Sequence, residues 1–228
     1  MDRPKYEFIR LAEADGGVVT LTLNRPDKKN ALSIALRDEV SDALAGLAGM
    51  DSVKVVVVTG SGTVFSAGFD LKEFARVTEP EFAKQLWDSS DRFHRALLEF
   101  PLPTIAAVNG PALAGGFDLA VLCDLRIAAE TATFAHPEIT FGDVVYSPLH
   151  DLVGGALARE LCLTGRSVGA AEALALRLVS AVVPAEELEA QTRRWAAQIV
   201  RTPRDILKRT KAKIIRRAAI GFRTTLDL

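Results

Sequence analysis

The chain has few of the residues that build metal centres or disulfide frameworks. Its 228 residues include two cysteines and three histidines. Cys123 and Cys162 lack the spacing of metal ligands, which indicates two small core residues in a reducing compartment. With so few histidines, scattered along the chain, we expect no metal site.

The chain also lacks an excess of charge and a long apolar segment. Its formal net charge is −1, which argues against a nucleic-acid partner because nucleic-acid-binding domains carry basic surfaces. A membrane-spanning helix needs about 20 apolar residues, and runs such as Val53–Thr59 are much shorter. The charged N-terminal residues Met1–Lys5 contain no apolar core of a signal peptide. We therefore expect a cytoplasmic protein with no membrane partner.

Apolar patterning predicts a mainly parallel α/β core. Tyr6–Leu11 and Val18–Leu23 have the pattern of a β-hairpin, and Ser33 is placed to cap a helix. Further buried strands alternate with helices, a sequence order typical of parallel sheets. The other expected strands are Val53–Thr59, Thr104–Val108, Leu125–Ala129 and Thr133–Ala135, and the expected helices include the stretch from Phe82 to Leu97 and Gly115–Cys123.

Helical spacing dominates from Val144 onward. Pro184 marks a change in the pattern, so we expect a core over residues 1–184 and a helical oligomerisation region over residues 185–228. The basic stretch Arg201–Arg223 has two interpretations, a solvated helix face or a partial contact with a phosphate. The helices expected in this half are Leu152–Leu163, Ala170–Leu176 and Ala185–Val200.

Two glycine-rich turns, Phe65–Leu71 and Ala112–Asp118, each follow a buried strand and lead into a helix. The N–H groups of Phe69 and Gly115 would then lie in first helical turns, where backbone donors have no intrahelical partner. Two such donors aimed at one point can stabilise an oxyanion. The alternative for either turn alone is that glycine permits a tight connection. The carboxylate beside each turn favours the oxyanion interpretation.

Two carboxylates are candidates for acid/base chemistry. Asp118 lies one helical turn beyond Gly115, so its side chain can point to the same region as that N–H. Glu138 follows an apolar, proline-interrupted segment, where burial would raise its pKa. Each has a structural alternative: Asp118 can favour the helix dipole, and Glu138 can be an ion-pair partner or a cap. His136, beside Pro137, is more simply a structural hydrogen-bonding residue than a base.

Other enzyme classes lack their motifs in this chain. Ser66 resembles the nucleophile of a hydrolase elbow, but that elbow needs glycine two residues earlier, where Val64 stands. No glycine-rich loop ends in Gly-Lys-Ser or Gly-Lys-Thr, which argues against a nucleoside triphosphatase. Gly60 and Gly62 form a fragment of a dinucleotide fingerprint whose third glycine is out of register.

An ordered set of motifs resembles the enoyl-CoA hydratase/isomerase, or crotonase, superfamily over most of the chain. Any one motif is modestly specific, whereas the set in this order is very specific. The segments that carry the resemblance are Asn24–Pro26, Asn30–Leu32, Phe65–Leu71, Ala106–Asp124, Phe134–Glu138, Leu163–Gly165, Ala170–Ala173 and Leu178–Pro184.

The resemblance implies a fold and a ligand. The fold is an α/β, crotonase-like spiral of repeated ββα units, with a C-terminal helical region that builds homotrimers or homohexamers. The ligand is an acyl-CoA substrate of fatty acid metabolism, and no separate cofactor is expected because coenzyme A is part of that substrate. The thioester carbonyl would lie between the amides of Phe69 and Gly115. The other expected substrate contacts are Arg25, Lys28, Ala67, Asp70, Leu71, Lys72 and Tyr146.

The resemblance also implies a chemistry. In a hydratase two carboxylates hold one water; Glu138 is expected to move the proton to or from Cα, and Asp118 to orient and deprotonate the water. An enoyl- or dienoyl-CoA isomerase needs one carboxylate that moves a proton along the acyl chain. A non-catalytic acyl-CoA-binding protein, and hydrolase or decarboxylase activity in the same family, are further alternatives.

The chain departs from the family pattern in three places. Asp118 is one methylene shorter than the usual hydratase glutamate, which withdraws the carboxylate by about 1.5 Å, and family isomerases also have aspartate there. Val144–Pro148 stands in place of the family's Pro-Gly-x-Gly-Gly, so Tyr146 is expected at the acyl pocket. The C-terminal helical region is abbreviated. We predict an enoyl-CoA hydratase, with the double-bond isomerase as the alternative.

Overall fold

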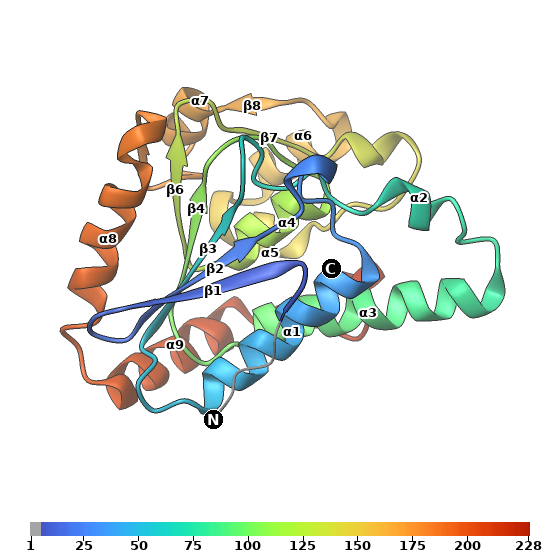
Figure 1. Ribbon diagram of the computed structural model, residues 1–228. Coiled ribbons are helices and arrows are strands. Elements are labelled where there is room, and N and C mark those ends of the chain that lie inside the picture. Colours follow the sequence, from blue (N-terminus) through green and yellow to red (C-terminus); the bar gives the residue numbers. More distant parts are fainter. Residues whose placement is uncertain (1–5) are drawn as a thin grey trace.

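Two sheets of unequal size organise the chain, whose computed structural model describes residues 6–228 (Figure 1). In this part of the chain the larger sheet has six strands in the order β1-β2-β3-β4-β6-β9. The first two strands form an antiparallel hairpin, and the later neighbours are parallel. The strands are β1 Ile9–Ala14, β2 Val18–Leu23, β3 Val55–Gly60, β4 Thr104–Val108, β6 Leu125–Ala129 and β9 Ala181–Val183.

The smaller sheet follows the carboxyl ends of the central strands. Its order is β5-β7-β8, with β5 parallel to β7 and β7 antiparallel to β8. β5 comes shortly after β4 in the chain, and β7 comes shortly after β6. The two sheets therefore meet at the carboxyl ends of β4 and β6, where the candidate site residues follow. Its strands are β5 Ala112–Leu113, β7 Thr133–Ala135 and β8 Val168–Gly169.

The larger sheet is buried on both faces because its central strands are apolar at successive positions. In β3, Val56 and Val58 belong to the main core, whereas Val55 and Val57 face a second cluster that includes Leu188 of α8. Figure 1 shows α8 along one side of the sheet, while α1 and α3 run beside each other on another side. α4 is buried along its whole length.

The helices are bounded by local signals in the sequence. The side chain of Ser33 accepts the N–H of Leu36 and caps the first long helix, as predicted. The α-helices are α1 Ile34–Gly49, α2 Leu71–Phe74, α3 Pro80–Leu98, α4 Gly115–Leu122, α5 Ser147–Val153, α6 Gly155–Thr164, α7 Ala170–Ala175, α8 Leu188–Ile199 and α9 Arg204–Ala218, and the 3₁₀-helices are η1 Pro26–Lys28, η2 Pro137–Thr140, η3 Ala185–Glu187 and η4 Thr225–Asp227.

The structure shifts two predicted helix boundaries. The helix expected from Leu152 is divided at Gly154, whose φ of 79° ends α5 before α6 begins. The helix expected from Ala185 begins at Leu188, because Pro184 is followed by a 3₁₀ turn. The division at residue 184 stays a prediction, and Met1–Lys5 lies outside the described residues. Among the helices of residues 6–228, none combines the length and apolar character that a bilayer crossing needs.

Candidate active site

The first glycine-rich turn lies between two other segments of the chain. The N–H of Leu32 donates to the carbonyl of Gly68 (2.8 Å), and the N–H of Leu113 donates to the carbonyl of Ser66 (2.9 Å). Ser66 also pairs with Ala112 in an isolated β-bridge. These bonds fix the first turn against β5, the strand that leads into the second turn.

Glycine allows the two turns to touch. A Cβ atom added to Gly68, whose φ is +83°, would lie 2.7 Å from Cβ of Ala114 and 3.1 Å from the amide nitrogen of Gly115. A Cβ atom added to Gly116 would lie 2.3 Å from the carbonyl oxygen of Ser66. Neither position has room for a side chain, so these glycines set the spacing of the turns.

The second turn begins α4 with a strained residue. Ala114 has φ 51° and ψ −129°, a sparsely populated combination for a residue with a Cβ atom. Its N–H donates to the carbonyl of Ala135 (2.9 Å), and its carbonyl accepts the N–H of Asp118 (3.1 Å). Gly115 therefore stands first in the helix, where its N–H has no intrahelical partner. Within residues 6–228, neither this amide nor that of Phe69 has a backbone hydrogen bond.

Three buried titratable side chains gather beside the second turn. The pairing of β5 with β7 brings the segment after β7 alongside α4. Nδ1 of His136 lies 2.9 Å from Oε1 of Glu138 and 3.8 Å from Oδ1 of Asp118. In the described part of the chain, Oδ1 of Asp118, Oε2 of Glu138 and Nε2 of His136 are buried without a hydrogen-bond partner. Buried polar atoms are nearly always paired in proteins, so three unpaired atoms in one cluster indicate a site for water or substrate.

Burial controls the electrostatics of this cluster. It raises the pKa of Asp118 to about 8, with a smaller lowering effect from His136 and a raising effect from Glu138. Burial acts to lower the pKa of His136, but the hydrogen bond to Glu138 and the two carboxyl groups outweigh it and raise that pKa. Near neutral pH burial therefore favours the protonated form of Asp118, and the two carboxyl groups favour the cationic form of His136.

Asp118→Asn is expected to stabilise the fold more strongly as the pH rises. Between the ordinary pKa of 3.8 and the raised value of about 8, the folded protein keeps a proton on Asp118 that the unfolded chain loses, so stability falls with pH. Asparagine removes this penalty, and because one pKa unit is worth about 1.4 kcal/mol we expect a gain of at least about 2 kcal/mol at high pH. Urea unfolding at about pH 5 and about pH 8 measures the gain. A gain that does not grow with pH would contradict this account.

Arg25 and Asp70, two of the predicted coenzyme A contacts, form an ion pair with each other. Nη1 and Nη2 of Arg25 both lie 3.2 Å from Oδ2 of Asp70, and Nη1 donates to the carbonyl of Ala31 (2.7 Å). The other carboxylate oxygen of Asp70 accepts the N–H of Lys72 (3.1 Å) and caps α2. The Arg25–Asp70 pair therefore braces the end of the first turn.

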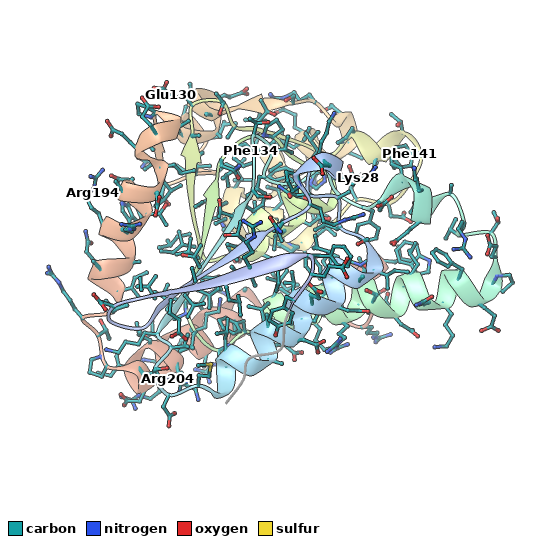
Figure 2. All side chains as sticks on the ribbon, in the orientation of Figure 1. Lys28, Glu130, Phe134, Phe141, Arg194 and Arg204 are labelled. Atoms are coloured by element: carbon teal, nitrogen blue, oxygen red, sulfur yellow. The ribbon has the colours of Figure 1, made fainter. Side chains whose placement is uncertain are left out.

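The remaining predicted contacts lie at the surface or near it. Lys28 on η1 (labelled in Figure 2) and Leu71 and Lys72 at the start of α2 are exposed, and Ala67 is half-buried. Tyr146 is half-buried before α5, with its ring centroid 5.5 Å from that of His150. Within residues 6–228, no hydrogen bond joins the Tyr146 side chain to the buried cluster of Asp118, His136 and Glu138. Its place at the acyl pocket stays a prediction.

Asn30 is fully buried, and its sequence context indicates no individual role for it. Its Oδ1 accepts the N–H of Arg25 (3.0 Å), and its Nδ2 donates to the carbonyls of Ser61 (2.9 Å) and Val64 (2.7 Å). Its own carbonyl accepts the hydroxyl of Ser66 (2.9 Å). One residue thus ties three segments around the first turn. Its only signal in the sequence was its place in the motif Asn30–Leu32.

A buried arginine lies against Phe69. The guanidinium carbon of Arg37 is 4.3 Å from the centroid of the Phe69 ring, and its nitrogens donate to the carbonyls of Leu32 (3.1 Å) and Leu86 (3.0 Å). Burial lowers the pKa of Arg37 to about 10, so the group remains charged at neutral pH. This contact holds the Phe69 ring in place beside its amide. Nothing in the sequence indicates this contact, because arginine is ordinary on a helix.

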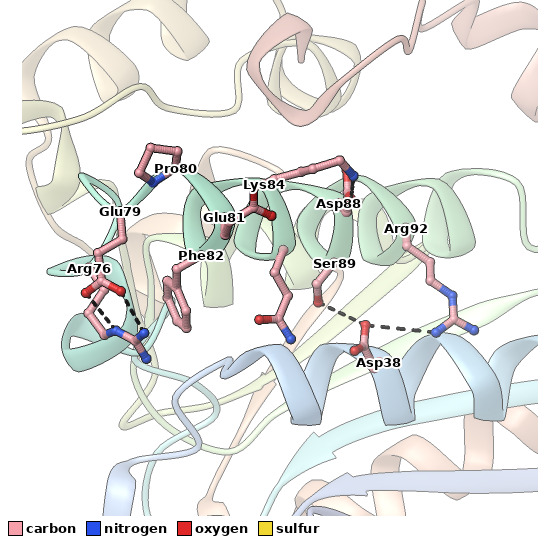
Figure 3. A pocket seen from close by; sticks show the side chains of 11 residues that line it. Asp38, Arg76, Glu79, Pro80, Glu81, Phe82, Lys84, Asp88, Ser89 and Arg92 are labelled. Carbon is pink, nitrogen blue, oxygen red and sulfur yellow. Dashed lines mark hydrogen bonds and ion pairs between the residues drawn. The ribbon is translucent and has the colours of Figure 1, made fainter.

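A groove of about 880 Å³ lies between α1 and α3 (Figure 3). Most of its charged side chains already have partners: Arg76 pairs with Glu79 (2.8 Å) and Arg92 with Asp38 (3.9 Å). The hydroxyl of Ser89 donates to the same Asp38 carboxylate (2.9 Å). With most of its charges paired, this groove is a weaker candidate for catalysis than the buried cluster beside α4.

Comparisons with known proteins identify the family of this chain. The profile of the family described as Enoyl-CoA hydratase/isomerase matches residues 13–224. A probable enoyl-CoA hydratase of Mycobacterium bovis is 41% identical over 198 residues, covering 85% of this chain and 76% of the relative. A putative enoyl-CoA hydratase of Thermus thermophilus is 37% identical over 213 residues, covering 91% of this chain and 84% of the relative.

A solved structure extends the similarity to three dimensions. The enoyl-CoA hydratase of Mycobacterium smegmatis aligns with a TM-score of 0.87 at 35% identity, covering 94% of this chain and 85% of that chain. This likeness confirms the predicted α/β, crotonase-like fold class. Because the family match spans nearly all of the described residues, this chain belongs to the enoyl-CoA hydratase/isomerase family.

Proposed function

We propose that this chain is an enoyl-CoA hydratase, an enzyme that adds water across the 2,3-double bond of an acyl-CoA thioester. The observation that carries the proposal is the contact between two glycine turns, with free amides at Phe69 and Gly115, beside three buried titratable groups. Relatives named as enoyl-CoA hydratases, at 37% and 41% identity, support the same activity.

In this proposal the two amides form an oxyanion hole. The thioester carbonyl accepts hydrogen bonds from Phe69 N–H and Gly115 N–H. When water adds at Cβ, electrons move onto the carbonyl oxygen and an enolate forms. Fixed donors stabilise that developing charge more than they stabilise the substrate, which lowers the barrier. Gly68 and Gly116 serve this step because they let the turns approach.

Hydration also needs a base that takes a proton from water and an acid that gives one to Cα. Asp118 and Glu138 supply these two carboxyl groups. Their unpaired oxygens, Oδ1 of Asp118 and Oε2 of Glu138, are the atoms available to a water held between them. The coenzyme A arm would run past the first turn toward Leu71, Lys72 and Lys28.

The proposal predicts that the purified protein hydrates crotonyl-CoA. Addition of water breaks the conjugation between the double bond and the thioester, so the absorbance of the conjugated thioester falls with time. The control is heat-denatured protein at the same concentration. Conversion of a 3-enoyl-CoA by a protein that leaves crotonyl-CoA unchanged would contradict hydration and favour the isomerase.

The double-bond isomerase is the second candidate because of Asp118. Its carboxyl group is shorter than glutamate by one methylene, and burial keeps it protonated near neutral pH. Isomerisation needs only Glu138 to move a proton between Cα and a more distant carbon. A non-catalytic acyl-CoA-binding protein would instead bind acyl-CoA tightly without turnover of any enoyl or dienoyl substrate.

We further propose a homotrimer or homohexamer, which rests on the family resemblance alone. We also propose a cytoplasmic location, although one relative, from Dictyostelium discoideum, is named a probable mitochondrial enoyl-CoA hydratase. Among residues 6–228 no group of three histidine, cysteine, aspartate or glutamate side chains is arranged to hold a metal ion. The proposed chemistry uses protein groups and the substrate.

A further inference from the structure

We propose that Arg37 is a positioning residue of the oxyanion hole, which holds the ring of Phe69 against Gly115 and so fixes the distance between the two amides. The inference rests on the proposed function and deepens it, because it names a residue outside the two glycine turns that aligns their donors. Arg37 is fully buried, so it acts through Phe69 and does not touch the substrate.

The ring of Phe69 contacts both Arg37 and Gly115. The guanidinium carbon of Arg37 lies 4.3 Å from the ring centroid, within the range of about 6 Å over which a cation attracts an aromatic face. A Cβ atom added to Gly115 would lie 3.0 Å from Cδ1 and 3.1 Å from Cε1 of the same ring. The ring therefore fills the space that a side chain at Gly115 would need. Through this one ring, α1 is packed against the first residue of α4.

The hydrogen bonds of Arg37 hold the first turn through its backbone. Nη1 of Arg37 donates to the carbonyl of Leu32 (3.1 Å), and the N–H of Leu32 donates to the carbonyl of Gly68 (2.8 Å). Leu32 also pairs with Phe69 in an isolated β-bridge. Nη2 of Arg37 donates to the carbonyl of Leu86 on α3 (3.0 Å). Because a guanidinium group is planar and its donors form a rigid fork, these bonds fix its orientation over the ring.

The charge of Arg37 is available to the ring because no carboxylate is bonded to it. Burial lowers the pKa of Arg37 to about 10, so the group stays charged at neutral pH. In the part of the chain that the structure describes, its donors reach two carbonyls and the hydroxyl of Ser89 (3.3 Å), but no carboxylate. The nearby carboxyl groups are bonded elsewhere: Glu73 accepts the N–H of Ile34 (2.8 Å), and Asp38 accepts the hydroxyl of Ser89 (2.9 Å). A desolvated cation attracts an aromatic face more strongly than an exposed one.

A second buried arginine allows a positioning role to be separated from a role in stability. Arg126 of β6 is buried, burial lowers its pKa to about 10, and it donates to the carbonyls of Cys123 (2.6 Å) and Leu178 (2.7 Å). Among the described residues no aromatic ring lies against its guanidinium group. Its loss would remove the same kind of hydrogen bonds without releasing Phe69. Arg126→Met is therefore the matched control for Arg37→Met.

The first test measures how strongly the two amides polarise a bound thioester. The absorption of cinnamoyl-CoA moves to longer wavelength when hydrogen bonds draw electrons onto its carbonyl oxygen, and no turnover is needed to see it. We expect this red shift in the wild type and in Arg126→Met, and a shift smaller by at least about half in Arg37→Met. Arg37→Lys keeps the charge and should give an intermediate shift.

The outcomes of this test separate the inference from the proposed function. Equal shifts in Arg37→Met and the wild type would overturn the inference alone, whereas no shift in the wild type would overturn the oxyanion hole and the inference with it. Phe69→Leu removes the same contact from its other side, because leucine keeps the amide and removes the ring. If Arg37→Met does not fold, a wild-type shift in Phe69→Leu would overturn the inference instead.

The second test is a double-mutant cycle on kcat for crotonyl-CoA with Arg37→Met and Phe69→Leu. Each single variant should lower kcat by about tenfold with little change in KM, which is less than the cost of losing a donor outright because the amides are displaced and not removed. If both residues act through one contact, the double variant should be about as active as either single variant. Losses that multiply to about a hundredfold would show independent roles and overturn the inference.

Discussion

Glu138→Gln is expected to lower kcat for hydration of crotonyl-CoA by about 10³-fold, while KM changes little. Acid/base catalysis by a positioned side chain is typically worth 10²–10⁴-fold. Glutamine keeps the size of Glu138 and can accept the hydrogen bond from His136, so the variant removes the acid/base carboxyl group while preserving the packing. A factor of about 10³ corresponds to about 4 kcal/mol in the activation free energy.

Glu130→Gln is the matched control for this prediction. Glu130 follows β6 on the surface, where its side chain is exposed (labelled in Figure 2), so the same chemical change should leave kcat within about twofold of the wild type. Stopped-flow or steady-state absorbance with equal enzyme concentrations compares the three proteins. If Glu138→Gln retains more than about a tenth of the wild-type kcat, Glu138 is not the principal acid/base group.

Gly68→Ala is expected to lower kcat by about 10²–10³-fold, the usual cost of losing one oxyanion donor. The new Cβ atom would lie 2.7 Å from Cβ of Ala114, so the two turns must separate. The backbone at Gly68 has φ +83°, which also disfavours alanine. Both effects displace the amide of Phe69, the next residue, from that of Gly115.

Gly169→Ala is the matched control, since an added Cβ atom there has no atom within 4 Å in the described residues. Thermal unfolding of both variants separates lost activity from lost fold. If Gly68→Ala folds and melts like the wild type but keeps full activity, the contact between the turns is not required for catalysis. If it does not fold, binding of acyl-CoA to any fraction that folds at reduced temperature provides the same comparison.

Much of the fold was predictable because most helices and strands have a local signal in the sequence. The Val53–Thr59 run was recognisable as a strand covered on both faces because its residues are apolar at successive positions. Thr104–Val108 was predicted with the bounds that the structure shows. β5, β8 and β9 were not predicted as strands, although the equally short Thr133–Ala135 was, because runs of two or three residues carry little periodicity. Their pairing depends on distant segments, which a local pattern does not contain.

The sequence indicated which residues form the candidate site, but not the electrostatic interactions between them. Phe69, Gly115, Asp118 and Glu138 were singled out because each lies near the end of a glycine turn or after a short strand. The sequence separates Asp118 from His136 by the rest of α4 and by the strands β6 and β7, and the β5–β7 pairing brings them together. The sequence alone therefore indicates a structural role for His136. The adjacent carboxylate two positions later was the one local signal that it had a charged partner.

The side-chain contacts that support the two turns could not be predicted from the sequence either. Arg25 and Asp70 were predicted as separate substrate contacts, whereas the structure joins them as an ion pair across 45 residues of sequence. Arg37 gave no signal, because its contact with Phe69 requires α1 and the first turn to be packed together. Such contacts are set by tertiary packing, and they decide how firmly the two amides are held.

The most direct test of the account is a crystal structure of the protein with a non-hydratable acyl-CoA thioester. We predict that the thioester oxygen lies about 3 Å from both the Phe69 and the Gly115 amide nitrogens, a distance typical of oxyanion donors. The acyl Cα and Cβ atoms should then face Asp118 and Glu138. An oxygen that contacts neither amide, or amides that point away from each other in the complex, would contradict the central claim.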